Sequence, residues 1–433
     1  MSSNEESFRQ LGILVSSIRA GYWGEDLPHR GYAPVRVVRN GDAARSPRIE
    51  PRSLPRRWMT PGEAANATVP LDATVLVSSG DVGRVARLSE PPTETVVASN
   101  FVRIVRPARG VSGSWLFHLL ASDQGQQAAH QASGGTTIEN LSVAQLKRWP
   151  VVAPDQDEQE EIARVLDITD ERSLKTASVG AKLAVIKRGL IHALLTQGLD
   201  ANGRLRDPAR HPELFGETSL GLLPKTWTVE AIGALLTDRN PAMRSGPFGS
   251  ALLKHELVPS GVPLLGIDNV HVDRFDARFT RFVTQRKAAE LARYQVFADD
   301  VMITIMGTVG RSCLVPANIG HALSSKHVWT ITFDQSRYLP YLASSQINHA
   351  SWLLAQLRRD EQGGIMAAIR SETLRAAEVP VPPKDEQFRI EKILRAIDRL
   401  IAAETAYLAK LRLMKPGLAS DLLFGKQASR AAA

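Results

Sequence analysis

The chain has 433 residues and only one cysteine, Cys313, so a disulfide within the chain is impossible. Its first six residues lack the basic start and apolar stretch of a signal peptide. The sequence also lacks an apolar run of the roughly 18 residues that a membrane-spanning helix needs. These absences predict a cytoplasmic protein, and the length predicts two to four domains.

Signatures of catalysis are missing as well. The sequence has no Gly-x-Gly-x-x-Gly dinucleotide fingerprint and no Walker-type phosphate loop, and His255-Glu256 lacks the second histidine of a zinc helix. A single cysteine excludes cysteine-rich zinc sites. Neither an Asn-Pro-Pro-Tyr-like tetrapeptide of an amino-methyltransferase nor a convincing nuclease triad is present. We therefore expect no catalytic residue, no metal site and no cofactor in this chain.

The charge balance is basic, with a formal net charge of +8 and a pI near 9.7. Such a balance favours a polyanionic partner. Arginine carries most of the positive charge, and no lysine occurs before Lys147. The planar guanidinium suits bidentate contacts with phosphates and guanine edges. A GC-rich genome produces the same arginine bias, so the composition alone does not identify the partner.

What the sequence does contain is a duplication. Asp157-Glu158-Gln159 recurs as Asp385-Glu386-Gln387, 228 residues later, and the same offset carries Asp170 to Asp398 and Lys187 to Lys415. The match needs no gap, so each copy is one continuous element. Two copies are too few for a solenoid, which needs three or more to bury its core. The repeat therefore indicates an internally duplicated protein.

The second copy has the pattern of a long helix. Its apolar residues recur on alternating three- and four-residue steps, which is the narrow seam of a coiled coil: Ile390, Leu394, Ile397, Ile401, Leu408, Leu411, Leu418 and Leu422. Pro380, Pro382 and Pro383 precede it and favour an extended approach to a helix start. The alternative, an ordinary amphipathic surface helix, rarely exceeds 25 residues.

The first copy has a weaker seam, with Thr169, Ser173, Thr176 and Gly180 at seam positions. A glycine inside a helix costs roughly 1 kcal/mol, so we expect this helix to bend or break near Gly180. Because neither helix has a large core of its own, the two are predicted to pack on each other as an antiparallel pair. The acidic residues at both starts could bind a metal, but carboxylates in a first helical turn more simply complement the helix dipole.

Related segments also precede each helix. The longest match joins Val75–Arg84 to Met302–Arg311, where a strand-like run leads into a Val-Gly-Arg turn that ends in Arg84 or Arg311. The glycines could serve turn geometry alone, but the arginine is kept in both copies. Three shorter matches complete the pattern: 21–24 with 246–249, 99–102 with 325–328, and Gly134-Gly135 with Gly363-Gly364.

The resulting order is globular unit, helix, linker, globular unit and helix. We predict the first globular unit at residues 1–150, a central helical spacer at 151–199, and a Gly-, Pro- and Asp-rich linker at 200–223. The second globular unit is predicted at 224–382, followed by a C-terminal helical spacer at 383–426 and a short tail at 427–433.

With these motifs the chain resembles the specificity (S) subunit of type I restriction–modification enzymes over essentially its whole length. Four features carry the resemblance: Val379-Pro-Val-Pro-Pro-x-Asp-Glu-Gln-x-x-Ile, Lys415-x-Gly417-Leu418 with Leu422-Leu423, Leu220-Gly-x-Leu-Pro224-x-x-Trp227, and Asp300-Val-Met-Ile-x-x-x-Gly307-x-x-Gly310. Each pattern is soft alone, but together and duplicated in this order they are specific. The first domain departs from the family pattern by being compact, with little chain before Gly21.

The resemblance implies an α+β fold. Two globular α/β target recognition domains would alternate with two long helices that form an antiparallel coiled coil with approximate two-fold symmetry. It also implies a non-catalytic subunit that binds a bipartite, asymmetric sequence in double-stranded DNA. The partners would be two methyltransferase subunits and, in some complexes, restriction subunits. S-adenosylmethionine and ATP with magnesium would bind those partners. The expected biological role is phage defence.

Two sets of site residues follow. The basic residues near the matched loops are predicted to contact DNA, most through phosphates and a minority through guanine edges: Arg36, Arg39, Arg56, Arg57, Arg84, Arg244, Arg274, Arg278, Arg281, Arg311, Lys326 and His327. The polar signature at both helix starts is predicted to form exposed, equivalent partner-binding faces: Glu158, Gln159, Glu386 and Gln387. Two other functions remain open, a fused restriction–methylation enzyme and a coiled-coil scaffold that binds protein instead of DNA.

Overall fold

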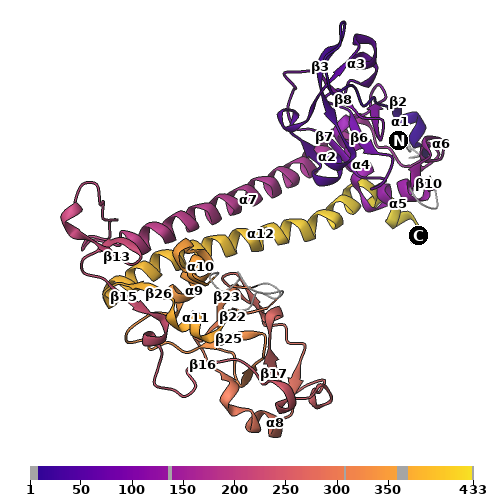
Figure 1. Ribbon diagram of the computed structural model, residues 1–433. Helices are drawn as coiled ribbons and strands as arrows, with labels where there is room; N and C mark the ends of the chain where they lie inside the picture. Colours follow the sequence, from indigo (N-terminus) through magenta and orange to yellow (C-terminus); the bar gives the residue numbers. More distant parts are fainter. Residues whose placement is uncertain (1–7, 135–138, 307–308, 358–368, 432–433) are drawn as a thin grey trace. The chain divides into compact units, whose positions relative to one another are not determined.

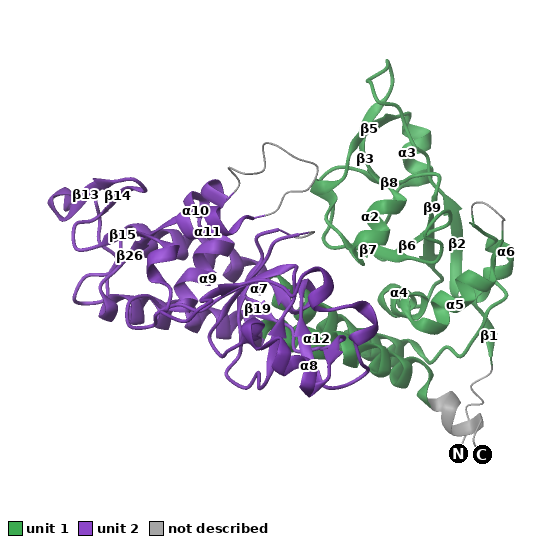
Figure 2. Ribbon diagram, turned by 60° about the horizontal axis from the view of Figure 1, so that its bottom comes forward, with its two compact units in different colours: residues 1–178, 404–433 green, residues 179–403 purple. Residues whose placement is uncertain are grey.

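The computed structural model describes residues 8–134, 139–306, 309–357 and 369–431, with side chains to residue 425 of the last stretch. Gly135, Gly307, Thr308 and the pair Gly363-Gly364, all used in the sequence comparison above, lie outside the described residues. The chain forms two compact units, shown in different colours in Figure 2. Unit 1 comprises residues 1–178 and 404–433, and unit 2 comprises residues 179–403. Each unit contains one globular head and one half of each of two long helices.

The head of unit 1 (head 1) is built on two sheets. The larger has the order β2-β9-β6-β7-β4, namely Val15–Ala20, Val102–Pro107, Thr74–Val77, Val85–Leu88 and Arg48–Ile49. The smaller has the order β5-β3-β8, namely Arg56–Met59, Ala33–Val38 and Val96–Ala98. The pair β3 and β8 is parallel, whereas β2, β9, β6 and β7 pair antiparallel.

The head of unit 2 (head 2) repeats this arrangement. One sheet has the order β16-β25-β22-β23, namely Met243–Arg244, Val328–Ile331, Val301–Thr304 and Ser312–Leu314. The other has the order β20-β17-β24-β21, namely Phe282–Val283, Val262–Leu265, Ala322–Ser324 and Gln295–Val296. Here too the inner pair, β17 and β24, is parallel. The duplication predicted from short motifs therefore extends to strand order and strand direction.

Helices and short strands fill the remainder of both heads. In head 1 they are β1 (Arg9–Gln10), α1 (Leu11–Leu14), α2 (Asn40–Arg45), η1 (Pro51–Ser53), α3 (Pro61–Ala67), α4 (Gly113–Ala121), α5 (Asp123–Gln131), β10 (Ser133–Gly134), β11 (Asn140–Leu141), α6 (Val143–Leu146) and β12 (Pro150–Val151). In head 2 they are η2 (Pro212–Leu214), β13 (Phe215–Thr218), β14 (Gly221–Pro224), β15 (Thr228–Ala231), η3 (Ile232–Leu235), η4 (Gly249–Ala251), η5 (Lys254–Glu256), η6 (Ile267–Asn269), β18 (Val270–His271), β19 (Arg274–Phe275), α8 (Gln285–Glu290), η7 (Ala292–Tyr294), α9 (Pro340–His349), α10 (Ser351–Leu357), α11 (Ser371–Ala376) and β26 (Glu378–Val381).

The two long helices are α7 (Gln156–Thr196) and α12 (Lys384–Ala431), both labelled in Figure 1. The helix α7 passes through Gly180 without interruption, so the break expected there is wrong. The helix α12 also continues beyond residue 426, through most of the stretch that the sequence assigned to a tail. Within the predicted linker, β13 and β14 form a hairpin with Phe215 opposite Pro224.

The repeated apolar residues at the helix ends belong to the cores of the heads. In unit 1, Ile162 and Leu166 of α7 join one buried cluster with Leu423 of α12 and with Trp115 of α4. In unit 2, Ile390 and Leu394 of α12 join a cluster with Leu195 of α7 and Tyr338. Burial of side chains of this size contributes about 1.5–3 kcal/mol each. Each head is thus packed on the start of one long helix and the end of the other.

Inside each unit the halves of α7 and α12 run antiparallel, and a repeated ion pair joins them. In unit 1 the Nζ of Lys415 lies 2.5 Å from Oδ1 of Asp170. In unit 2 the Nζ of Lys187 lies 2.6 Å from Oδ1 of Asp398. The two lysines and the two aspartates are the residues that the offset of 228 relates. The antiparallel pairing predicted from the seam is therefore confirmed within both units, and duplicated residues make the same contact in each.

Candidate nucleic-acid interface

In head 1, three of the matched loops meet at one edge of the larger sheet. Strand β2 ends opposite the start of β9, with Ala20 beside Arg103, and β6 ends there too, with Val77 beside Val102. The loops after β2 and β6 and before β9 therefore lie together, and backbone hydrogen bonds join them, including one of 3.0 Å from the Ser78 amide to the Phe101 carbonyl. We call residues 21–24, 78–84 and 99–101 the loop edge of head 1.

The same loops meet in head 2. Strand β16 ends with Arg244 beside Thr330 of β25, and β22 ends with Thr304 beside Val328. The Ile305 amide donates to the carbonyl of His327 at 3.1 Å, as Ser78 does to Phe101 in head 1. We call the described residues of 245–249, 305–311 and 325–327 the loop edge of head 2. Antiparallel pairing brings these segments together, because the end of one strand lies beside the start of its neighbour.

The turn that ends each match has the same geometry in both heads. Gly83 has a φ of 91° and Gly310 a φ of 85°, in the left-handed region that glycine adopts without strain. The carbonyl of the next residue, Arg84 or Arg311, accepts a hydrogen bond from the last residue of the strand, at 2.8 Å and 2.9 Å. Turn geometry therefore accounts for both glycines, and the arginine follows the turn directly. The Arg84 side chain is exposed and that of Arg311 is half-buried.

Several of the predicted basic residues do gather at these edges. Lys326 is exposed and His327 half-buried at the loop edge of head 2. Burial lowers the pKa of His327, and the nearby charges of Lys326 and Arg281 lower it further. In head 1, Arg39 directly follows β3. It lies next to the loop edge, because the amide of Ser99 donates to the carbonyl of the preceding residue, Val38. The Arg39 guanidinium binds Asp42 at 3.0 Å. Basic side chains thus lie at or beside the loop edge of each head.

Other predicted residues lie elsewhere or are partly neutralised. Arg36 and Arg56 both pair with Glu94, at 3.0 Å and 2.9 Å. Arg274 and Arg278 have well-exposed side chains, and both approach the carboxylate of Asp276. The hydrogen bond from Arg278, followed by the charges of Arg278 and Arg274, holds the pKa of Asp276 well below its usual range.

Two predicted DNA contacts are contradicted by burial. Arg244 is 3% exposed, and its guanidinium binds the buried carboxylate of Asp300 and donates to the Gln295 carbonyl at 2.6 Å. Arg57 is 9% exposed; it pairs with Asp26 and lies 4.5 Å from the ring centroid of Trp23. These arginines support the strands and loops, and their charge is not presented to a phosphate.

Aromatic side chains at the loop edges were not selected from the sequence. Trp23 is 42% exposed and Phe101 48% exposed at the edge of head 1, and Phe248 is 55% exposed at that of head 2. The Trp23 ring makes a cation–π contact with the Arg57 guanidinium. On a surface that binds double-stranded DNA, exposed aromatic rings can contact the methyl groups of thymines in the major groove. Their place inside the matched segments was the signal that could have identified them.

Comparison with known proteins identifies the family. The family described as "Type I restriction modification DNA specificity domain" matches residues 61–183 and 278–413, more than half of the chain. The chain belongs to this family. Its members provide the DNA sequence specificity of type I restriction–modification systems and are non-catalytic subunits. The family resemblance recognised in the sequence is thereby confirmed.

Individual relatives agree with this assignment. The chain is 23% identical over 357 residues to the "Putative type I restriction enzyme MjaX specificity subunit" of Methanocaldococcus jannaschii, covering 81% of this chain and 76% of that protein. The fold matches the S subunit of a type I restriction–modification system from M. genitalium with a TM-score of 0.57, at 15% identity and 98% coverage of both chains. A chain from "Structural basis underlying complex assembly and conformational transition of the type I R-M system" matches with a TM-score of 0.52, at 13% identity, covering 98% of this chain and 99% of that one.

The polar signature of this specificity subunit is largely buried, so the expected exposed faces at Gln159, Glu386 and Gln387 are wrong. Gln159 is 3% exposed and Gln387 is 1% exposed. The Oε1 of Gln159 accepts from the amide of Ser112 at 2.9 Å, and that of Gln387 accepts from the amide of Leu339 at 2.9 Å. Ser112 precedes α4 and Leu339 precedes α9. The repeated glutamine therefore fastens each head to its long helix.

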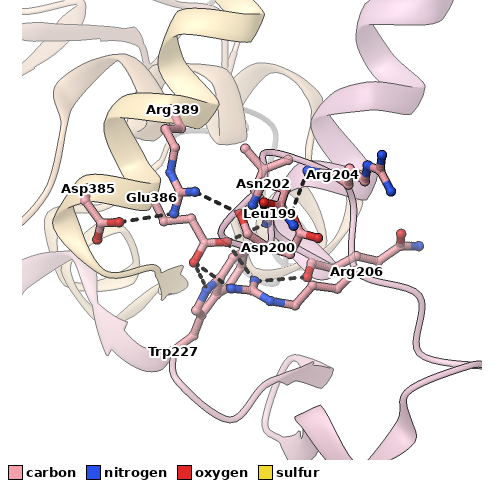
Figure 3. Close-up of polar contacts among 10 residues, drawn as sticks. Leu199, Asp200, Asn202, Arg204, Arg206, Trp227, Asp385, Glu386 and Arg389 are labelled. Atoms are coloured by element: carbon pink, nitrogen blue, oxygen red, sulfur yellow. Dashed lines mark hydrogen bonds and ion pairs between the residues drawn. The ribbon is translucent and has the colours of Figure 1, made fainter.

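Glu386 has an internal role as well (Figure 3). Its carboxylate is 2% exposed and accepts from the Leu199 amide at 2.6 Å, from the Arg206 guanidinium at 2.7 Å and from the indole of Trp227 at 3.0 Å. Gly198 adjoins this cluster with a φ of 68°, and a Cβ there would lie 2.4 Å from the Glu386 carboxylate. The acid secures the segment after α7 to the start of α12. Glu158, at the equivalent place in unit 1, is half-buried.

Apolar side chains, by contrast, are exposed at equivalent positions on the long helices. Val185 and Ile186 of α7 are 58% and 55% exposed, and Leu413 and Met414 of α12 are 82% and 54% exposed. The two pairs are related by the offset of 228. Large exposed apolar side chains in clusters mark interaction surfaces in soluble proteins. We call these the apolar pairs of unit 2 and unit 1.

Two classes of site find no support in the described part of the chain. None of its helices has both the length and the apolar character required to cross a membrane. Within the same residues, no group of three or more histidine, cysteine or acidic side chains is arranged to hold a metal ion.

Proposed function

We propose that this specificity subunit reads a bipartite DNA sequence, with the loop edge of each head contacting one half of the target. The observation that carries the proposal is that both heads collect the same three loops at the same strand ends, and fill them with cationic and aromatic side chains. Because those side chains differ between the heads, the two half-sites should differ in sequence.

The residues at each edge support different base contacts. In head 1 the exposed Asn100 directly precedes Phe101 in the loop edge, and an asparagine amide is suited to the N6 and N7 edge of adenine. In head 2, His327 has a lowered pKa and is neutral at pH 7, so its ring can offer one donor and one acceptor to a base. Lys326, Arg281 and Arg311 are suited to phosphates or to guanine edges of the second half-site.

Replacing Arg311 and Lys326 with alanine should weaken binding through the second half-site only. Each lost phosphate contact should lower the salt slope of binding by about one unit, whereas a lost base contact should cost about 1–3 kcal/mol at one target position. Methylation mapping of the reconstituted complex against a target library measures both half-sites at once. Arg84→Ala is the counterpart in head 1 and should affect the first half-site.

Arg375→Ala is a suitable control, because Arg375 is exposed and lines a hollow with Ala242 and Asp334, at the opposite ends of β16 and β25. Equal loss at both half-sites in the head 2 variant would contradict the assignment of one head to each half. A wild-type protein that binds no DNA in the presence of its methyltransferase partner would favour the protein scaffold instead.

We further propose that the two apolar pairs are docking surfaces for two methyltransferase subunits, to which restriction subunits can be added. Their repetition at the offset of 228 supports two like partners, since duplicated surfaces bind the same protein. S-adenosylmethionine, and ATP with magnesium, would then bind to those partners.

Leu413→Ser with Met414→Ser should remove or weaken one methyltransferase subunit, and Val185→Ser with Ile186→Ser the other. Because these side chains are exposed, the free energy of unfolding should change by less than about 0.5 kcal/mol. Native mass spectrometry of the complex reports the stoichiometry. Arg412→Ser serves as the control, because Arg412 is exposed and lies two residues from Met414, on the other side of the helix. Retention of two partners when all four residues are changed would refute this placement.

A further inference from the structure

Unit 1 has a pocket to which the proposed function assigns no role. It lies between the α4–α5 turn and the last third of α12 and has a volume of about 340 Å³. His118 and Gln124 line it from the head, and Pro416, Ser420 and Phe424 line it from the helix. All of these residues belong to unit 1.

The equivalent place in unit 2 is occupied by the chain itself. The offset of 228 carries Gln124 to Trp352 and relates Ser420 to His192. In unit 2 the rings of Trp352 and His192 pack against each other, with centroids 5.8 Å apart. The pocket of unit 1 is therefore the site of this aromatic pair with both rings missing, because a glutamine and a serine stand in their place.

The residue that accepts a hydrogen bond from the Trp352 indole in unit 2 also has a polar counterpart in unit 1. In unit 2 the indole Nε1 of Trp352 donates to Oε1 of Gln346 at 3.3 Å, and the same offset relates Gln346 to His118. The Nε2 of His118 lies 2.8 Å from Oδ1 of Asp167, a carboxylate whose pKa is held well below its usual range despite partial burial, by His118, Ser114 and Arg87. Nε2 thus carries the proton.

The state of the His118 ring follows from its surroundings. Burial lowers the pKa of His118, which keeps the ring neutral at pH 7. A neutral ring protonated at Nε2 has its acceptor lone pair on Nδ1. His118 can therefore accept a hydrogen bond from an indole N–H, as Gln346 does in unit 2.

We propose that this pocket receives a tryptophan side chain of the methyltransferase subunit that docks on unit 1. The inference rests on the proposed recruitment of methyltransferase subunits. Two observations favour that partner as the source. Leu413 of the apolar pair, Pro416 and Ser420 follow one another at spacings of three and four residues, so the pocket continues the same stripe of α12. In addition, residues 425–433, which follow Phe424, contain no aromatic side chain that could enter the pocket.

The consequence is that the two docking surfaces are not equivalent. The partner on unit 1 gains a buried aromatic anchor, whereas the partner on unit 2 meets a place that Trp352 already fills. Buried aromatic anchors dominate binding energies at interfaces. Stepwise addition of the methyltransferase should therefore show one tighter and one weaker site.

The test is to move the aromatic pair of unit 2 into unit 1. The full-length Gln124→Trp, Ser420→His variant should weaken the tighter methyltransferase site at least tenfold, as measured by titration with native mass spectrometry, while the weaker site is unchanged. The matched control, Trp352→Gln with His192→Ser, should leave the tighter site intact. Thermal unfolding of both variants checks that the folded state is kept.

A photo-crosslinker identifies the occupant directly, even if the filled variant folds poorly. With benzoylphenylalanine in place of Asp123, an exposed residue that also lines the pocket and whose counterpart in unit 2 is Ser351, the crosslinked peptide should come from the methyltransferase and contain tryptophan. A peptide from a second copy of this chain, or one from the methyltransferase without tryptophan, would overturn the inference. So would two sites of equal affinity that the pocket-filling variant leaves unchanged. A wild-type chain that binds no methyltransferase would instead refute the proposed function on which the inference rests.

Discussion

Glu386→Gln is expected to destabilise unit 2 by about 3–5 kcal/mol, the usual cost of removing one partner from a buried ion pair. The carboxylate accepts hydrogen bonds from the Leu199 amide, the Arg206 guanidinium and the Trp227 indole, and is 2% exposed. A glutamine would leave Arg206 without a counter-charge and would point an amide donor at groups that are themselves donors. Urea unfolding followed by tryptophan fluorescence measures the change, since Trp227 belongs to the cluster.

The adjacent residue is the matched control. Asp385 has a side chain that is 77% exposed and pairs with Arg389 one helical turn away, at 3.1 Å. Exposed pairs of this kind are worth about 0.3–0.5 kcal/mol, so Asp385→Asn should change the free energy of unfolding by no more than that. Similar effects of the two substitutions would show that the Glu386 cluster does not stabilise the junction between the segment after α7 and the start of α12.

Ile397→Asp with Ile401→Asp should also cost several kcal/mol, because the two charges would be placed against the half of α7 in the same unit. Both isoleucines are partly buried and lie on the seam of α12. Uncompensated burial of a charge is among the most costly changes in a protein. We expect a lower unfolding midpoint and a loss of partner binding.

Leu400→Asp separates this effect from a general one of acidic residues on α12. Leu400 belongs to the same helix and is 54% exposed, so an aspartate there remains in water. Its effect on the free energy of unfolding should stay within about 0.5 kcal/mol. If the double variant and Leu400→Asp unfolded at the same denaturant concentration, the antiparallel pairing of α7 with α12 would not be the source of stability.

The sequence alone could not distinguish residues that join a head to its long helix from residues that bind a partner. The repeat of Gln159 as Gln387 shows that the position matters in both copies, but both burial and partner binding would produce such a repeat. The difference lies in what approaches the glutamine, which is the amide before α4 or α9, about fifty residues earlier in the chain. No local pattern predicts that approach.

The same reason accounts for the arginines. Arg244 and Arg311 both end or follow strands in head 2, and local sequence does not distinguish them. Tertiary packing places Asp300 beside Arg244 and buries both, whereas Arg311 follows a turn at the loop edge. Charge alone therefore overestimated the number of arginines available to DNA.

The sequence by itself determined the periodic and repeated parts of this protein: two long helices, their antiparallel pairing and a pair of related heads. Helical seams and duplications are properties of spacing along the chain, and spacing is visible in one dimension. Only the tertiary structure decided which side chains are buried. The fold places four of the predicted site residues in internal contacts, namely Gln159, Glu386, Gln387 and Arg244, and leaves the apolar pairs exposed. Burial depends on residues brought together from distant parts of the chain, and the sequence does not record those neighbours.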